Sequence, residues 1–190
     1  MSEQAVPDGN VRLTITFLEM PQPPARPALH PPHRLKLALM RAERPTISFY
    51  RYLYETVGGP WFWWERRQYS DRRLAEAIHD DRVEVYVLYV GGVPAGYAEL
   101  DRRQGPEAID LAYFGLIPDY IGLGLGPYLL DWAIRQAWSY GPQRVTVNTC
   151  TLDHPKALPM YQRAGFQPVR QVTRIIEDPV GRTPPTPPAD

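Results

Sequence analysis

The sequence predicts one α/β domain in which helices flank both faces of a mixed central β-sheet. Its length of 190 residues suits one domain, since single domains commonly span about 100–200 residues. Segments with strand periodicity are interleaved with segments of helix periodicity. A tight Gly91-Gly92 turn joins two of the strands, whereas the later strands need helical crossovers, so the sheet must be mixed.

The N-terminal part predicts a strand followed by a connector. Residues Val11–Leu18 alternate between apolar and polar side chains, which is typical of a strand. Residues 21–33 are rich in proline, which lacks an amide donor and fixes φ, so they form a connector with no regular interior. Proline returns in residues 178–190, where we expect a disordered or extended tail beyond a domain of residues 1–177.

Two helices are expected next, over residues Ile47–Val57 and Ser70–His79, the second with Ser70 as its N-cap. The remaining elements follow from periodicity and from the glycines that end them. The expected strands are Val83–Val90, Pro94–Leu100, Ala108–Ile117, Arg144–Thr149 and Phe166–Ile176. A long helix is expected from Pro127 to about Ser139 and a short one before Gly165.

Composition limits the classes of partner. Lysine plus arginine number 21 and aspartate plus glutamate number 21, so no basic surface for nucleic acid is indicated. The single cysteine, Cys150, excludes an internal disulfide framework and cysteine-based zinc spacing. No basic start followed by an apolar stretch and no run of about eighteen apolar residues occurs. We therefore expect a cytoplasmic protein with no membrane or nucleic-acid partner and no metal.

The most informative motif is the glycine-rich segment of residues 117–130. Gly122, Gly124 and Gly126 lie between a predicted strand and a helix that we expect to begin near Pro127. Glycines let the backbone approach an anion, and a helix N-terminus offers unpaired N–H groups and the positive end of its dipole. The spacing predicts a pyrophosphate-binding loop, with a plain strand-to-helix turn as the alternative.

Together with residues 153–166, this loop resembles the GNAT superfamily of acetyl-CoA-dependent N-acetyltransferases. The family pattern Gln/Arg-x-x-Gly-x-Gly/Ala falls on residues 121–126, and Asn-x-x-Ala-x-x-x-Tyr-x-x-x-Gly-Phe falls on residues 154–166. Three positions depart from the patterns: Ile121 and Leu123 replace residues that are often polar or basic, and His154 replaces Asn. The resemblance covers about residues 83–177 and implies a GNAT-like domain.

By that resemblance, the protein transfers acetyl from acetyl-CoA to a primary amine by direct attack in a ternary complex. The residues that would bind the coenzyme are Leu116, Ile117, Gly122, Leu123, Gly124, Leu125, Gly126, Pro127, His154 and Tyr161. A backbone N–H near Leu116–Ile117 would polarise the thioester carbonyl, and the Tyr161 hydroxyl would protonate the leaving thiolate. The alternative role for Tyr161 is that of a core aromatic.

Two carboxylates compete for the role of base, and we favour Asp110. Strict alternation places Asp110 on an apolar face with Phe114, where a lone carboxylate is costly unless it has a function or a partner. Its position also resembles that of the catalytic glutamate in the histone-lysine branch of the family. Glu99 shares a strand face with Tyr97 and Asp101. Because all three side chains are polar, the alternative to a catalytic role is that Glu99 is simply exposed to solvent.

The aromatic cluster Trp61-Phe62-Trp63-Trp64 lies between the first two expected helices. In the family this region shapes the acceptor site, so Trp61, Trp63 and Trp64 are candidates for substrate binding. A hydrophobic lid or a homodimer contact is the alternative.

Two further residues are expected to have structural roles. Asp153 is predicted to cap the short helix, a role that is also the alternative for His154, and Cys150 is predicted to be a buried small residue rather than a nucleophile.

The acceptor stays open at this point, because a small amine or amino acid and a protein lysine or N-terminus all fit. Two other classes of function also remain. One is a catalytically silent acyl-CoA-binding module, and the other is an interaction protein recruited through its proline-rich ends.

Overall fold

A seven-stranded sheet forms the centre of the structure, a computed structural model that describes residues 9–177. Its strands, in chain order, are β1 (Asn10–Met20), β2 (Leu37–Arg41), β3 (Val83–Val90), β4 (Val93–Asp101), β5 (Ala108–Leu116), β6 (Arg144–Cys150) and β7 (Gln167–Glu177). The spatial order is β2-β3-β4-β5-β6-β1-β7, and of these neighbours only β5 and β6 run parallel. The sheet is therefore mixed, which confirms the predicted class.

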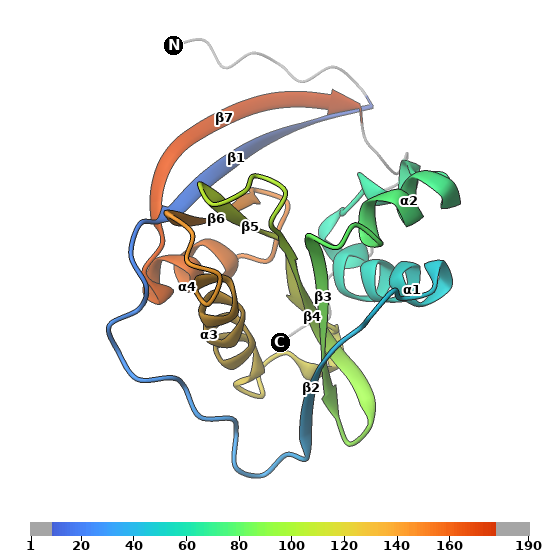
Figure 1. The fold of residues 1–190 in the computed structure, drawn as a ribbon. Helices are drawn as coiled ribbons and strands as arrows, with labels where there is room; N and C mark the ends of the chain where they lie inside the picture. Colours follow the sequence, from blue (N-terminus) through green and yellow to red (C-terminus); the bar gives the residue numbers. More distant parts are fainter. Residues whose placement is uncertain (1–8, 178–190) are drawn as a thin grey trace.

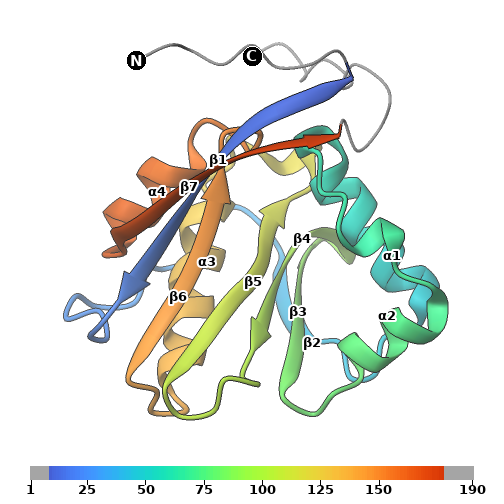
Figure 2. The ribbon, with the colours of Figure 1, turned by 90° about the horizontal axis from the view of Figure 1, so that it is seen from above.

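Helices cover both faces of this sheet (Figures 1 and 2). On one face lie α1 (Ile47–Gly58) and α2 (Asp71–Ile78), and on the other lie α3 (Leu125–Trp138) and α4 (Ala157–Ala164). The short 3₁₀ segments are η1 (Gly59–Trp61), η2 (Arg66–Gln68) and η3 (Pro118–Tyr120). Ser70 accepts a hydrogen bond from the Arg73 amide, so the predicted N-cap of α2 is confirmed.

Two hydrophobic cores result from the alternation of side chains along the central strands. In β4, Ala98 and Leu100 pack with α3 and α4, whereas Tyr97 packs with α1 and α2. Because both faces are covered, β3 is a nearly continuous apolar run with six consecutive buried residues. Among the described residues, no helix is long and apolar enough to cross a membrane.

The sequence reading missed β2, an edge strand of five residues that pairs with β3. It is short and only half-buried, so its periodicity is weak. The preceding connector, residues 21–33, has no helix or strand, as expected. It is nevertheless held on α3, because buried Asp131 accepts a hydrogen bond from the Leu29 amide at 2.8 Å and pairs with Arg26 at 2.8 Å.

β5 and β6 diverge after a short paired stretch. Only Ala108–Asp110 pair with Arg144–Thr146, although β5 continues to Leu116 and β6 to Cys150. The long strands β1 and β7 arch together over this end of the sheet (Figure 1). A parallel pair that opens leaves backbone N–H and C=O groups without strand partners, so this opening is where a ligand can be bound by the backbone.

Candidate active site

A cavity of about 470 Å³ lies at the opening between β5 and β6. Its walls come from β5, the glycine loop, α4, the aromatic segment after α1, and the arch of β1 and β7. The predicted loop, Tyr161 and the tryptophan cluster therefore meet in one place, although they are far apart in the sequence.

The glycine loop depends on left-handed backbone at two positions. Gly122 has φ +87° and Gly124 has φ +77°, values that favour glycine. Gly124 is the N-cap of α3 and has no side chain to occupy the first N–H groups. The expected helix start near Pro127 is wrong by two residues, because α3 begins at Leu125. Pro127 therefore removes one donor from the first turn, and the amides of Leu125 and Gly126 remain for an anion.

At the end of β5, the two predicted backbone donors differ in orientation. The Ile117 amide donates to the Ala95 carbonyl at 2.9 Å, so it is used within the sheet. Successive amides of a strand point to opposite sides, so the Leu116 amide faces away from β4, toward the opening between β5 and β6. Leu116 is thus the residue of this pair whose N–H can meet a thioester carbonyl.

The cavity wall includes most of the residues predicted for the coenzyme: Leu116, Gly122, Gly124, Gly126, Pro127, His154 and Tyr161. Three others lie outside it. Ile117 and Leu125 are buried in the two cores, and Leu123 is exposed.

Tyr161 both packs in the core and reaches the cavity. Its ring contacts Phe114 and Phe166 at centroid distances of 6.2 and 6.0 Å, and the residue is 5% exposed. Burial, followed by the charges of Asp153 and Asp110, raises the pKa of its hydroxyl above the ordinary value. The phenol is therefore protonated at neutral pH, as a proton donor must be.

The expectation of a solvated face for Glu99 is wrong, because this carboxylate is fully buried. It accepts hydrogen bonds from the Arg66 guanidinium at 2.5 Å and from the Tyr50 hydroxyl at 2.6 Å. Burial raises the pKa of the Glu99 carboxyl, whereas the Arg66 charge and the Tyr50 hydrogen bond oppose that rise. Helices α1 and α2 cover the face that looked polar, and Glu99 does not line the cavity.

The predicted face of Asp110 is also wrong, and a β-bulge is the reason. Leu111 pairs with Leu100 and Tyr113 pairs with Glu99, so Ala112 is an extra residue that reverses the alternation. Asp110 pairs with Asp101 and so lies on the face of Glu99, opposite to Phe114. Its carboxylate accepts a hydrogen bond from the Thr146 hydroxyl at 2.6 Å and does not line the cavity.

Burial raises the pKa of Asp110 to about 6, which gives a stability prediction. An acid with a raised folded-state pKa contributes stability that is present below its ordinary pKa and is lost as pH rises through about 6. Asp110→Asn keeps an acceptor for Thr146 and removes this loss. We expect the variant to be more stable than the wild type by on the order of 2–3 kcal/mol at pH 8 but by only about 1 kcal/mol at pH 4.5, where the unfolded carboxyl already ionises in part.

Urea unfolding at both pH values measures this difference. Asp71→Asn is the matched control, because the Asp71 side chain is 78% exposed and its loss should change stability little at either pH. An equal gain for Asp110→Asn at both pH values, or no gain at pH 8, would show that the Asp110 charge is not costly.

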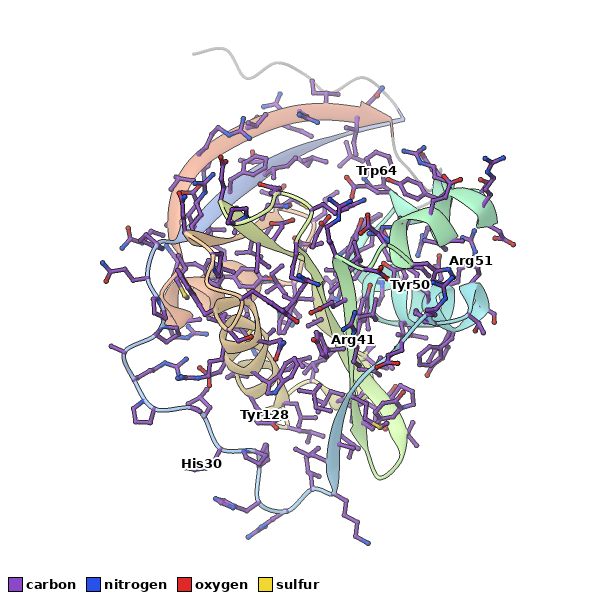
Figure 3. All side chains as sticks on the ribbon, in the orientation of Figure 1. His30, Arg41, Tyr50, Arg51, Trp64 and Tyr128 are labelled. Carbon is purple, nitrogen blue, oxygen red and sulfur yellow. The ribbon has the colours of Figure 1, made fainter. Side chains whose placement is uncertain are left out.

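The aromatic segment bridges the two sides of the opening. Trp63 lies over Gly58, where an added Cβ would come within 2.3 Å of the indole, so only glycine fits there. The indole N–H donates to Asp153 at 3.3 Å, and the Trp61 ring contacts the His154 ring at a centroid distance of 4.7 Å. Trp61, Trp63 and Trp64 all line the cavity, and Figure 3 shows Trp64 beneath the arch of β1 and β7.

Asp153 is not the helix cap that its sequence position suggests. The N-cap residue of α4 is Lys156, and Asp153 instead accepts hydrogen bonds from the Thr149 hydroxyl at 2.7 Å and the Cys150 amide at 2.8 Å. It lines the cavity, as does Glu65, which accepts a hydrogen bond from Tyr113 at 3.0 Å. Sequence reasoning assigned neither Asp153 nor Glu65 to the site. The available signal was a short polar turn directly after β6.

The free thiol of Cys150 also lines the cavity. Burial, together with the nearby Asp153 charge, raises its pKa to about 11. A protonated thiol is a poor nucleophile, so Cys150 is poorly suited to form a covalent intermediate.

Comparison with known proteins identifies the family. Residues 34–166, more than half of the chain, match the Acetyltransferase (GNAT) family. The chain belongs to the GNAT acetyltransferase family. No curated protein sequence gives a significant match.

Solved structures share the fold at low sequence identity. The GCN5-related N-acetyltransferase from Sphaerobacter thermophilus superposes with a TM-score of 0.64 at 17% identity, over 87% of this chain and 51% of that one. The GCN5-related N-acetyltransferase from Kribbella flavida gives a TM-score of 0.55 at 15% identity, over 90% and 60%. This chain therefore spans only part of the length of several similar proteins.

An aminoglycoside N-acetyltransferase solved in complex with CoA is also similar, with a TM-score of 0.53 at 16% identity, over 75% of this chain and 95% of that one. These likenesses concern the fold.

Proposed function

We propose that this protein transfers acetyl from acetyl-CoA to a primary amine by direct attack in a ternary complex. One observation carries the proposal: a single cavity contains the glycine loop, the Leu116 strand end and Tyr161. The loop offers backbone donors to the pyrophosphate, and the opening between β5 and β6 accepts the pantetheine arm and the acetyl group. Coenzyme specificity for acetyl-CoA is part of the proposal.

The roles of the residues follow from the chemistry of amide formation. The Leu116 N–H polarises the thioester carbonyl, and the neutral amine nitrogen attacks the carbonyl carbon. A C–N bond forms, the C–S bond breaks, and the thiolate takes a proton from Tyr161. The ammonium loses one proton before the attack and a second as the intermediate collapses, so one proton restores Tyr161 and one enters solvent.

Water is the proposed first acceptor of the amine proton. Neither Asp110, which the sequence favours as the base, nor its competitor Glu99 lines the cavity. Asp110 would then act only through intervening water, and Glu99 would serve mainly to position β4 against Arg66.

The other function classes are separable from this one. A silent acyl-CoA-binding module would bind the coenzyme without forming an amide. Recruitment through proline-rich ends is less well supported for residues 21–33, whose backbone bonds to α3 side chains, while residues 178–190 lie outside the described residues. A cytoplasmic location stays a prediction, and so does a homodimer.

Replacing Gly124 by valine should abolish coenzyme binding. The position has φ +77°, which valine rarely adopts, and the new side chain would lie beside Pro32 at the N-cap of α3. Acetyl-CoA at 100 times its Kd should stabilise the wild type by about 2.7 kcal/mol, seen as a rise in Tm, and leave Gly124→Val unchanged.

Gly105→Val is the matched control. Gly105 has φ +71° in the turn between β4 and β5 and no neighbour within 4 Å of an added Cβ, so it has similar backbone strain outside the cavity. This variant should have a lower Tm but keep the full shift with acetyl-CoA. A retained shift in Gly124→Val would place the coenzyme elsewhere.

A further inference from the structure

The part of the cavity away from the glycine loop is lined mainly by aromatic and apolar side chains. Trp61, Phe62, Trp63 and Trp64 form one wall. The arch of β1 and β7 contributes Leu13, Ile15 and Ile176 to the lining of the same cavity. A ligand that displaces water from such walls gains by burying apolar surface of its own.

Trp63 connects this apolar region to the proposed reacting centre. Its six-membered ring lies 3.8 Å from the position of an added Cβ on Gly115, and Gly115 directly precedes Leu116. The ring also packs against Tyr54 and Tyr113 at centroid distances of 5.4 and 5.3 Å, which holds it in place. An acceptor lying on Trp63 would therefore be next to the strand end that is proposed to bind the thioester carbonyl.

Asp153 supplies a carboxylate beside the Trp63 indole. Its Oδ2 atom accepts the two short hydrogen bonds from Thr149 and Cys150, whereas Oδ1 accepts only the 3.3 Å bond from the Trp63 indole. Oδ1 thus keeps capacity for one more donor on the side of the indole. The Asp153 charge also contributes to the raised pKa of Tyr161, as expected for two groups facing one cavity.

We propose, on the basis of the proposed acetyl transfer, that the acceptor is a primary amine attached to a flat apolar body, an arylalkylamine, whose ammonium binds Asp153 against the Trp63 indole. The aromatic body would lie between the segment of residues 61–64 and the arch. An ammonium bound to this carboxylate at the edge of the indole is stabilised by the opposite charge, and the aromatic body gains by apolar contact with the surrounding rings.

The charges of the cavity argue against a polycationic acceptor such as an aminoglycoside. Only two carboxylates among the described residues, Asp153 and Glu65, line it. Three cationic side chains, those of Lys156, Arg163 and Arg174, line it as well. Several ammonium groups on one ligand would find too few anionic partners and would meet like charges.

The first experiment compares acceptors with the wild-type protein and saturating acetyl-CoA. Phenethylamine should exceed propylamine in kcat/KM by at least about 10-fold, because the ring adds buried apolar contact in the transition state. Kanamycin and a lysine-containing peptide should be poorer than phenethylamine. A preference for kanamycin, propylamine or the peptide would overturn the arylalkylamine assignment while leaving acetyl transfer intact, whereas failure with every amine would count against the proposed function itself.

The second experiment tests Asp153 by a matched pair of ligands that differ in charge. Asp153→Asn should raise the KM of phenethylamine by about 10-fold or more. It should change the inhibition constant of neutral phenethyl alcohol by less than about 2-fold. A general structural defect would instead weaken the binding of both ligands. Glu76→Gln, an exposed change on α2, is the control for protein quality.

Equal weakening of amine and alcohol in Asp153→Asn would overturn the ammonium contact. A larger effect on the amine in Glu65→Gln than in Asp153→Asn would overturn the choice of Asp153. If Asp153→Asn does not fold, the acceptor comparison in the wild type still decides the class of substrate.

Discussion

Replacing Tyr161 by phenylalanine is expected to lower kcat by about 10²–10⁴-fold, because the variant lacks the hydroxyl that protonates the leaving thiolate. The ring contacts with Phe114 and Phe166 remain, so stability and acetyl-CoA affinity should stay close to those of the wild type. Initial rates at saturating acetyl-CoA, with coenzyme affinity from calorimetry, separate these effects.

Tyr128→Phe is the matched control for this change. Tyr128 lies in the first turn of α3, close to the loop in sequence, but does not line the cavity (Figure 3). Its kcat should stay within about 3-fold of the wild type, since this hydroxyl belongs to a partly buried residue outside the cavity and takes no part in the proposed proton transfer. An unchanged kcat in Tyr161→Phe would show that Tyr161 is only a core aromatic and not the proton donor.

The second large effect concerns the buried pair of Arg66 and Glu99. Arg66→Met leaves the Glu99 carboxylate fully buried without its counter-charge, with the Tyr50 hydroxyl as its remaining hydrogen-bond partner among the described residues. Removal of one partner of a buried pair commonly costs about 3–5 kcal/mol, so we expect a loss of that size in urea unfolding at pH 7.

The double variant Arg66→Met/Glu99→Gln distinguishes the pair from ordinary packing. It removes both charges and keeps an acceptor for Tyr50, so it should be more stable than Arg66→Met alone. A loss under about 1 kcal/mol in the single variant, or strictly additive effects in the double one, would mean that Arg66 does not compensate the Glu99 charge.

Local sequence patterns predicted the glycine loop and the helix of Tyr161, which meet in the cavity. Glycine spacing identifies the loop because Gly122 and Gly124 adopt left-handed backbone, a conformation that favours glycine at each position whatever its distant neighbours are. The helix of Tyr161 was likewise predictable, because Gly165 ends it with φ +113°. Strand and helix periodicity was enough for most elements, since each depends on neighbours within a few residues.

The surroundings of Glu99, Asp110 and Asp153 depended on contacts between distant segments. Arg66, the partner of Glu99, is 33 residues away in a segment without clear periodicity, so nothing local indicated that Glu99 is buried and paired. The bulge at Ala112 reversed the face assigned to Asp110. The alternation of apolar and polar residues in the sequence does not reveal where such an extra residue lies. Asp153 resembled a helix cap until the folded chain placed it beside Trp63.

The sheet order shows the same limit. β1 was expected as a strand, but its place between β6 and β7 depends on pairing with residues more than a hundred positions later. That pairing forms the arch and with it one wall of the cavity. Strand existence is a local property, whereas strand neighbours are decided by the whole fold.

The most direct test is to incubate the protein with acetyl-CoA and phenethylamine, propylamine, kanamycin and a lysine peptide in turn, and to measure both free CoA thiol and N-acetylated product by mass spectrometry. The proposed function predicts equal amounts of thiol and acetylated amine with at least one acceptor, and neither product with Gly124→Val. Binding of acetyl-CoA with no acetylated amine from any acceptor would contradict it and would favour the silent acyl-CoA-binding module.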